Sequence, residues 1–102
     1  QYNFIKKVAG QLNVRNLTLI KGDVFKFLAT VDTPFDIVFA DPPYTLEDFG
    51  RIPGLILESG AVAPGTIVVV EHSKAYDFSQ LPGFIDHRTY GSVNFSIFRV
   101  GE

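Results

Sequence analysis

Apolar residues recur along this chain at two spacings, which together predict helices and strands in alternation. From Tyr2 to Leu12 they recur as on one face of a helix, and Asp23 is a residue type that caps a helix, here from Val24 to Ala29. A further helix is expected from Gly54 to Ser59. Short apolar runs bounded by Gly, Pro or Asn predict the strands. These strands cover Leu17–Ile20, Phe35–Ala40, Thr66–Glu71, Phe84–Tyr90 and Val93–Val100.

The order of these elements predicts an α/β fold formed by a single domain over residues 1–102. Ile67 to Val70 are all apolar, which is typical of a central parallel strand buried on both faces. The tight turn at Gly91 and Ser92 makes the last two strands an antiparallel hairpin. We therefore expect a mainly parallel sheet with a C-terminal antiparallel hairpin.

Composition and charge limit the classes of protein to which this chain can belong. The 102 residues are 46% hydrophobic, which is enough apolar surface for one packed core. The absence of Cys excludes disulfides and thiolate chemistry and fits a cytoplasmic protein. No apolar run is long enough to cross a membrane, so no membrane partner is expected. The net charge is -2 and the Lys and Arg are scattered, which argues against a large nucleic-acid footprint within this chain. His87 and Arg88 are accordingly expected on a solvated strand face rather than at RNA phosphates.

The most informative motif is Asp41-Pro42-Pro43-Tyr44, which directly follows a predicted strand. Proline fixes φ and pushes the preceding residue to extended geometry, so the motif is rigid, and neither Pro has an N–H that would compete as a donor. The Asp41 carboxylate and a proline carbonyl can then accept both hydrogens of an amino group and aim its lone pair at an electrophile. Tyr44 offers a ring on which a base can stack. These are the candidate catalytic residues, and the alternative interpretation is a rigid turn capped by Asp41.

Two further strand ends carry polar residues. Gly22 and Asp23 follow the first predicted strand, and Glu71 and His72 follow the apolar run of the third. In a sheet of parallel strands these ends share an edge with Asp41, where ligands bind. Asp23 is equally well explained as a helix cap, and a single His is weak evidence for a metal, so we expect no metal site. No Ser, His and Asp stand at a spacing that suggests a hydrolase.

Several segments resemble those of the bacterial methyltransferases that modify guanine N2 in small-subunit ribosomal RNA. The resemblance covers essentially the whole chain and rests on Gly22–Phe25, Phe35–Tyr44, Val69–His72 and the Tyr90-Gly91 turn. It implies a Rossmann-like, S-adenosylmethionine-dependent methyltransferase fold, in which Asp41, Pro42, Pro43 and Tyr44 hold the target base beside the methyl donor. It also implies that Gly22, Asp23 and Val24 bind S-adenosyl-L-methionine, with Asp23 near its adenine. The implied partner is ribosomal RNA or a ribosomal subunit assembly intermediate.

The chain also departs from that family. It contains no Gly-x-Gly sequence, whereas such enzymes carry a glycine-rich loop after their first strand and an acidic residue after their second. The resemblance therefore implies the C-terminal portion of a methyltransferase domain, with the N-terminal strands missing and no activity on its own. The Asp-Pro-Pro-Tyr element is shared with adenine-N6 DNA methyltransferases, which stay an alternative. A non-catalytic α/β interaction domain that keeps the motif as scaffold is another.

The strand order of that family, three-two-one-four-five-seven-six, gives an expectation about the sheet. A chain with strands three to seven lacks the partners between Leu17–Ile20 and Phe35–Ala40, and buried unpaired backbone groups are costly. The two strands can pair directly, with the Val24–Ala29 helix as the crossover, or two chains can lend each other an edge. We expect the chain to self-associate or to require the missing partner segment.

Overall fold

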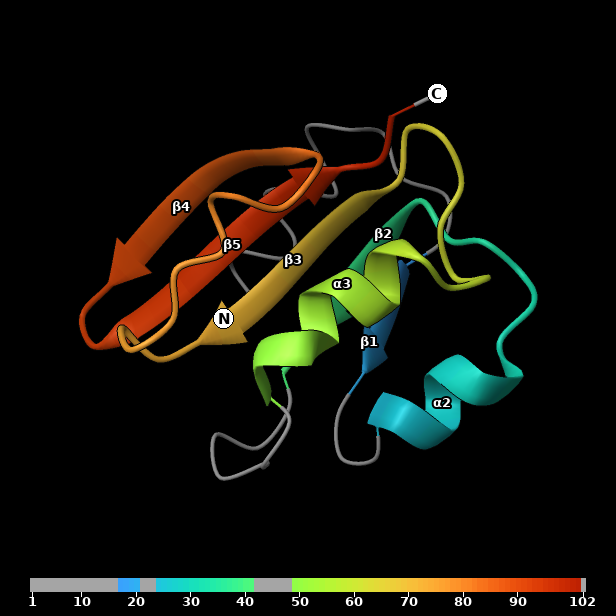
Figure 1. Cartoon of the computed structure of the whole chain (residues 1–102), viewed down its shortest axis with the longest axis horizontal. Helices are drawn as coiled ribbons and strands as arrows, with labels where there is room; N and C mark the ends of the chain where they lie inside the picture. The colour runs from blue at the N-terminus through green and yellow to red at the C-terminus, as the bar shows by residue number, and fades with distance from the viewer. Residues whose placement is uncertain (1–16, 21–23, 42–48, 102) are drawn as a thin grey trace.

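The computed structural model describes residues 17–20, 24–41 and 49–101, and the helix expected from Tyr2 to Leu12 lies outside these ranges. In chain order the elements are β1 (Leu17–Ile20), α2 (Val24–Thr30), β2 (Ile37–Ala40), the 3-10 helix η1 (Phe49–Arg51), α3 (Ile52–Leu57), β3 (Ile67–His72), β4 (Phe84–Tyr90) and β5 (Val93–Arg99) (Figure 1). Within the described ranges, no helix is both long and apolar enough to span a membrane.

The strands form one five-stranded sheet in the order β1-β2-β3-β5-β4. The first three are parallel to one another, whereas β5 runs antiparallel to both β3 and β4. This confirms the predicted α/β fold, with a parallel part followed by an antiparallel hairpin. All six residues of β3 are buried, as expected for a strand in the middle of the sheet.

β1 lies directly beside β2, in register from Leu17 opposite Ile37 to Ile20 opposite Ala40. α2 forms the connection between these two parallel strands. The chain therefore pairs the two strands by itself, which is the first of the two arrangements expected from the strand order. The exchange of edges between two chains is not needed for this pairing, and self-association stays a prediction.

The amino ends of the central strands are tied together by Thr66, whose side chain is 3% exposed. Its hydroxyl donates to the Phe35 carbonyl at 2.7 Å and accepts from the Ala63 N–H at 3.0 Å. Its carbonyl accepts from the Val100 N–H at 2.9 Å. Because the N–H groups of Phe35 and Thr66 donate to the loop carbonyls of Ala61 and Ala63, β2 and β3 begin later than the apolar pattern predicts.

α3 begins earlier than expected, at Ile52 rather than at Gly54. Pro53 lies in its first turn, where the missing N–H would have no helical partner in any case. The helix ends where the Ser59 hydroxyl donates to the Ile56 carbonyl at 2.7 Å. Proline therefore marks the interior of the first turn here, not the boundary of the helix.

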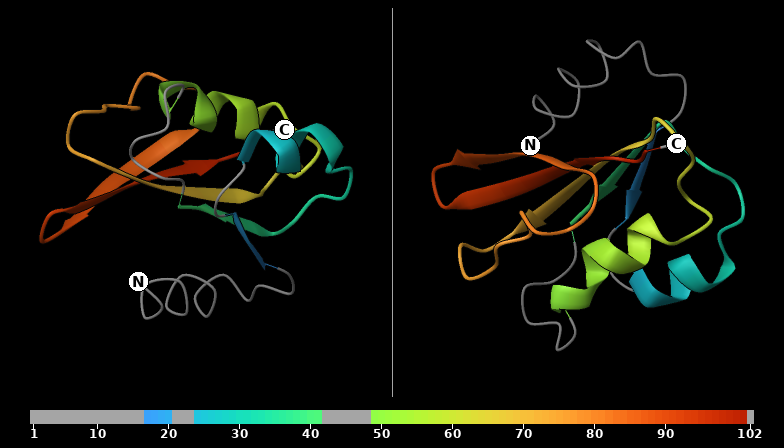
Figure 2. Two further views of the ribbon diagram at one scale, coloured as in Figure 1. Left: turned by 90° about the horizontal axis from the view of Figure 1, so that it is seen from below. Right: turned by 45° about the horizontal axis from the view of Figure 1, so that its top comes forward.

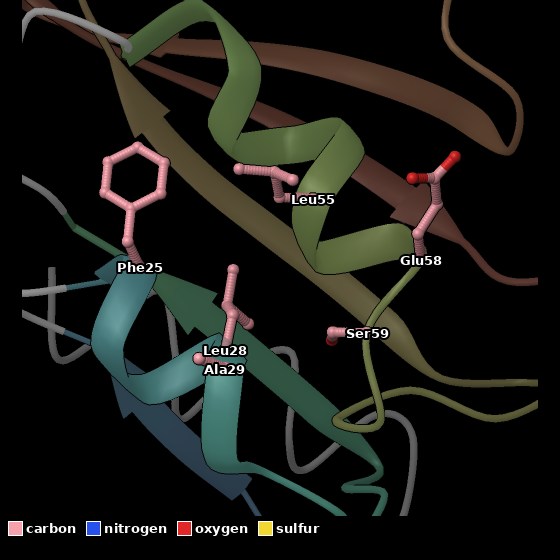
Figure 3. A pocket seen from close by; sticks show the side chains of 6 residues that line it. All are labelled: Phe25, Leu28, Ala29, Leu55, Glu58 and Ser59. Atoms are coloured by element: carbon pink, nitrogen blue, oxygen red, sulfur yellow. The ribbon is translucent and has the colours of Figure 1, made fainter.

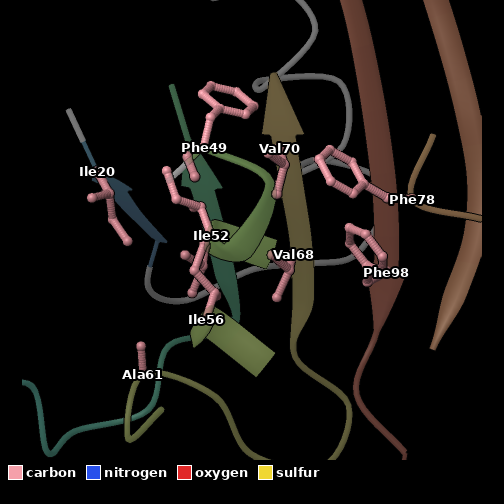
Figure 4. Packing of buried hydrophobic residues seen from close by; sticks show 11 residues of the cluster. Ile20, Phe49, Ile52, Ile56, Ala61, Val68, Val70, Phe78 and Phe98 are labelled. Atoms are coloured by element: carbon pink, nitrogen blue, oxygen red, sulfur yellow. The ribbon is translucent and has the colours of Figure 1, made fainter. Parts of the chain in front are cut away.

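α2 and α3 cover the same face of the sheet, as the left view of Figure 2 shows. The core on this face combines sheet, helix and loop residues (Figure 4). Its buried members are Ile20, Val38, Ala40, Phe49, Ile52, Ile56, Ala61, Val68, Val70, Phe78 and Phe98. The opposite face buries a second cluster that includes Phe39 and Phe95, whose rings are 5.8 Å apart.

The hairpin is shaped by two glycines in the left-handed region. Gly91 has φ +63° in the β4–β5 turn, as expected for a tight hairpin. Gly83 has φ +83°, and a Cβ there would lie 2.6 Å from the Arg99 carbonyl oxygen. The Gly83 carbonyl itself accepts from the Arg99 N–H at 2.8 Å, so this close approach fixes the start of β4 against the end of β5.

Candidate active site at the carboxyl edge of the sheet

The parallel strands β1, β2 and β3 end side by side, as predicted. Ile20 pairs with Ala40, and Ala40 pairs with Val70. Asp41 follows β2, and its backbone N–H donates to the Ile20 carbonyl at 2.9 Å. Because β2 lies between β1 and β3, the half-buried Asp41 leaves the sheet between two neighbouring strand ends. This is the position at which open α/β sheets bind ligands.

The other predicted site residues follow the ends of β1 and β2 in the sequence. Pro42, Pro43 and Tyr44 follow Asp41, and Gly22 and Asp23 follow β1, but all five lie outside the described residues. Val24 is the first residue of α2. Their catalytic and cofactor-binding roles therefore stay predictions.

β3 continues past Val70 and brings two more polar residues to this edge. Glu71 and His72 are 6% and 0% exposed and pair with Phe95 and Asn94 of β5. Since Ala40 and Val70 are partners, Asp41 and Glu71 are the next residues on neighbouring strands. The edge therefore has acidic residues at two adjacent strand ends.

His72 is held by two short hydrogen bonds. Its Nδ1 lies 2.7 Å from the Ser73 carbonyl, which only accepts, so Nδ1 carries the proton. Its Nε2 then accepts from the Ser96 hydroxyl at 2.7 Å. Burial lowers the pKa of His72, the Ser73 carbonyl opposes this shift, and the nearby His87 adds to it. His72 is thus a neutral, fully engaged side chain.

The Ser96–His72 pair does not form a hydrolytic site. Ser96 is 0% exposed, and the Nδ1 partner of His72 is a backbone carbonyl rather than a carboxylate. The pair belongs to a polar cluster in which His87 Nε2 and Thr89 Oγ1 both lie within 3.0 Å of Asn94 Oδ1. This cluster fixes the hairpin against β3.

An aromatic stack, formed by Phe49, Tyr76 and Phe78, lies beside the same edge. The Tyr76 ring is 4.8 Å from the Phe49 ring at 29° and 5.6 Å from the Phe78 ring at 12°. The rings of Phe78 and His72 are nearly perpendicular, at 81°, with their centroids 4.9 Å apart. The sequence analysis missed this stack, although aromatic residues at positions 76 and 78, in a segment without strand character, were a signal for its Tyr76–Phe78 contact.

The solvent side of β4 carries a salt bridge rather than unopposed positive charge. Arg88 Nε lies 2.8 Å from Asp86 Oδ2, and both side chains are about half exposed, at 51% and 45%. The bond to Arg88 lowers the pKa of Asp86, and the bond to Asp86 raises the pKa of Arg88. This agrees with the expectation of a solvated strand face for Arg88, whereas the neighbouring His87 points to the other face of β4 and bonds to Asn94.

Within the described ranges, no group of three His, Asp or Glu side chains could hold a metal ion. A hollow of about 360 Å³ lies between the two α-helices and not at the strand ends (Figure 3). It is lined by Phe25, Leu28, Ala29, Leu55, Glu58 and Ser59.

Comparison with known proteins supports the assignment of the fold. The sequence profile of a family described as conserved hypothetical protein 95 matches residues 1–99. A protein of Rickettsia prowazekii named an uncharacterized methylase is 33% identical over 67 residues, which are 64% of this chain and 28% of that protein. The chain therefore spans little more than a quarter of the length of this relative.

Solved structures share the fold. A candidate methylase of Haemophilus influenzae superposes with a TM-score of 0.63 at 24% identity, over 98% of this chain and 66% of its own. A candidate methyltransferase of Escherichia coli gives 0.63 at 22% identity, over 95% and 55%. A hypothetical protein of Thermus thermophilus gives 0.58 at 28% identity, over 76% and 42%.

Proposed function

This chain belongs to the family described as conserved hypothetical protein 95, and from that premise we propose that it forms part of an S-adenosylmethionine-dependent methyltransferase. The proposed substrate is an exocyclic amino group of a nucleic-acid base, namely guanine N2 in small-subunit ribosomal RNA. The enzyme would meet this base in the RNA or in a ribosomal subunit assembly intermediate. The names of the Rickettsia, Haemophilus and Escherichia proteins support methyl transfer, and the sequence resemblance supports the base.

The position of Asp41 carries this proposal. It stands at the carboxyl end of a buried central strand, and its N–H is bonded to the end of the neighbouring strand. The backbone that presents its carboxylate is therefore fixed from two sides. Asp41 accepts a hydrogen bond from the target amino group and orients the nitrogen lone pair, which is catalysis by positioning. Tyr44 stacks on the base.

The described residues of this edge fit a positively charged cofactor. Glu71 provides an acidic residue at the strand end beside Asp41, and a carboxylate favours a nearby cation. When bound, S-adenosylmethionine supplies an electrophilic methyl group on a sulfonium sulfur. Gly22, Asp23 and Val24, at the end of β1, are proposed to hold its adenosine portion.

Substitution of Asp41 in the full-length protein tests this function. With S-adenosylmethionine and small-subunit RNA, Asp41→Ala is expected to remove about 2 to 4 kcal/mol of transition-state stabilisation. The methylation rate should therefore fall roughly 30- to 900-fold. Cofactor affinity should change by no more than about twofold. Asp36→Ala is the matched control, because Asp36 is an exposed Asp at the other end of the same strand. Methylation by Asp41→Ala at the wild-type rate would refute the role.

The choice of substrate separates the alternatives. Transfer of label to DNA adenine, with none to RNA, would favour the adenine-N6 DNA methyltransferase. No transfer to either, together with no S-adenosylmethionine binding, would favour a non-catalytic interaction domain. Transfer to guanine N2 of small-subunit RNA is the expected result.

A further inference from the structure

The turn between β4 and β5 lies at the same edge of the sheet as the candidate site. Asn94 of β5 pairs with His72 at the end of β3, and the preceding residue, Val93, pairs with Tyr90 of β4. The turn therefore lies just beyond the carboxyl end of β3, as Figure 1 shows. The function proposed above assigns no role to the Tyr90-Gly91 sequence at this turn.

One row of residues across the sheet connects the candidate site to this hairpin. Asp41 follows β2 beside Glu71 of β3. Glu71 pairs with Phe95 of β5, and Phe95 pairs with Arg88 of β4. Neighbouring strands lie about 4.8 Å apart, so about 14 Å separates the backbone at Asp41 from that at Arg88. About four stacked nucleotides cover this distance. Tyr90, two residues after Arg88, is therefore within reach of nucleotides that flank a base bound at Asp41.

Tyr90 combines a supported ring with large exposure. Its ring lies 5.9 Å from the Phe95 ring at 65°, and Phe95 is only 2% exposed. Phe95 in turn lies 5.8 Å from the Phe39 ring of β2. Tyr90 itself is 50% exposed. The core therefore supports the ring, while half of its surface stays open to a ligand.

Arg88 makes a second contact with Tyr90. Side chains alternate between the two faces of a strand, so Arg88 and Tyr90 lie on the same face of β4. The pKa of Arg88 is raised by its bond to Asp86 and, second, by its bond to Tyr90. Because Arg88 Nε lies 2.8 Å from Asp86 Oδ2, the charge of Arg88 is balanced within the strand. This surface therefore suits stacking on a ring rather than attraction to phosphate.

We propose that Tyr90 is a stacking site for an unpaired RNA base that flanks the methylated base. The proposal rests on the function proposed above and adds a contact through which the enzyme binds its substrate. Every base has a π face, so an aromatic side chain stacks on bases with little regard to sequence. Stacking does not depend on positive charge, which fits the net charge of -2.

RNA binding by the full-length protein tests this site without any need for methylation. The probe is fluorescein-labelled small-subunit ribosomal RNA, and fluorescence anisotropy measures its Kd. Tyr90→Ala should raise Kd about 5- to 150-fold, which is the usual contribution of one stacked base. Tyr90→Phe and Tyr90→Trp keep a flat ring and should stay within about twofold of the wild type. Ile85→Ala is the matched control, because Ile85 is an apolar side chain of the same strand that is 56% exposed.

Two further measurements separate stacking from charge and from folding. The ratio of Kd between Tyr90→Ala and the wild type should be equal at low and high salt, since phosphate contacts are the ones that salt weakens. A ratio that falls to one at high salt overturns the assignment to stacking. If Tyr90→Ala does not fold, Tyr90→Leu replaces it, because leucine keeps an apolar contact with Phe95 without a flat ring. The emission that Tyr90→Trp adds should be quenched by RNA and not by polyphosphate, which has no bases.

The outcomes distinguish this inference from the proposed function. An unchanged Kd in Tyr90→Ala or Tyr90→Leu, in a protein that binds and methylates RNA, overturns the inference and leaves the function intact. Weaker binding to the assembled small subunit but not to protein-free RNA also overturns it, because that result indicates contact with a ribosomal protein. A wild-type protein that binds no RNA overturns both.

Discussion

The parallel and antiparallel parts of this sheet are held together by different interactions. Every residue of β2 and β3 is buried, and α3 packs Ile52 and Ile56 into the core on the helix side. Most of β4 is exposed, and its contacts with β5 include polar pairs such as His87 with Asn94. Apolar burial is strong but non-directional, whereas hydrogen bonds set register. The candidate site is therefore built on the part with the larger buried apolar area.

The largest effect on stability is expected in a comparison of one isoleucine from each part of the sheet. Ile56→Ala, in α3, should reduce the free energy of unfolding by about 2 to 5 kcal/mol, because it leaves a cavity in the core. Ile85→Ala, in β4, removes the same atoms from a side chain that is 56% exposed. It should change the free energy of unfolding by less than about 0.5 kcal/mol. Urea unfolding measures both. Equal losses would show that the two parts do not differ in this way.

The next largest effect on stability is expected from loss of the buried hydrogen bond between Ser96 and His72. Ser96→Ala removes the donor to His72 Nε2 inside the protein, and an unsatisfied buried group costs about 1 to 3 kcal/mol. Ser92→Ala, in the exposed hairpin turn, is the control. If urea unfolding finds the two variants equally stable, the polar cluster does not stabilise the hairpin.

The low pKa of His72 predicts a smaller effect of pH. Burial favours the neutral ring in the folded protein, so the unfolded chain binds the proton more readily. Stability that is present above the ordinary pKa of about 6.5 should be lost as the pH falls below it. His87 and Asp77 are the titratable side chains that also act on this ring. Urea midpoints at pH 8 and pH 5.5 should differ less in His72→Gln than in the wild type, and an equal difference would contradict the assignment.

The smallest effect is expected at the exposed ion pair. Arg88→Ala removes the partner of Asp86, but both side chains are about half exposed and water screens their attraction. The urea midpoint should not shift measurably at physiological salt. A clear loss would mean that exposed polar contacts, and not only buried ones, hold the hairpin.

The sequence predicted those features that depend on neighbouring residues. β4 has the predicted bounds, because Gly83 and the Gly91 turn delimit it, and Asp41 lies at the predicted sheet edge, because an apolar strand precedes it. The stack of Tyr76 on Phe49 could not be predicted, since the two residues are brought together only by the fold. The direct pairing of β1 with β2 was one of two open arrangements for the same reason.

The bonds around Thr66 have a mechanical consequence. They join the amino ends of the central strands, so small movements of these strands would be rotations about this point. The six residues of β3 cover about 20 Å, so a rotation of about 3° at Thr66 would move the His72 end by about 1 Å. A substitution at Thr66, a full strand length from the candidate site, would then change the alignment of the strand ends.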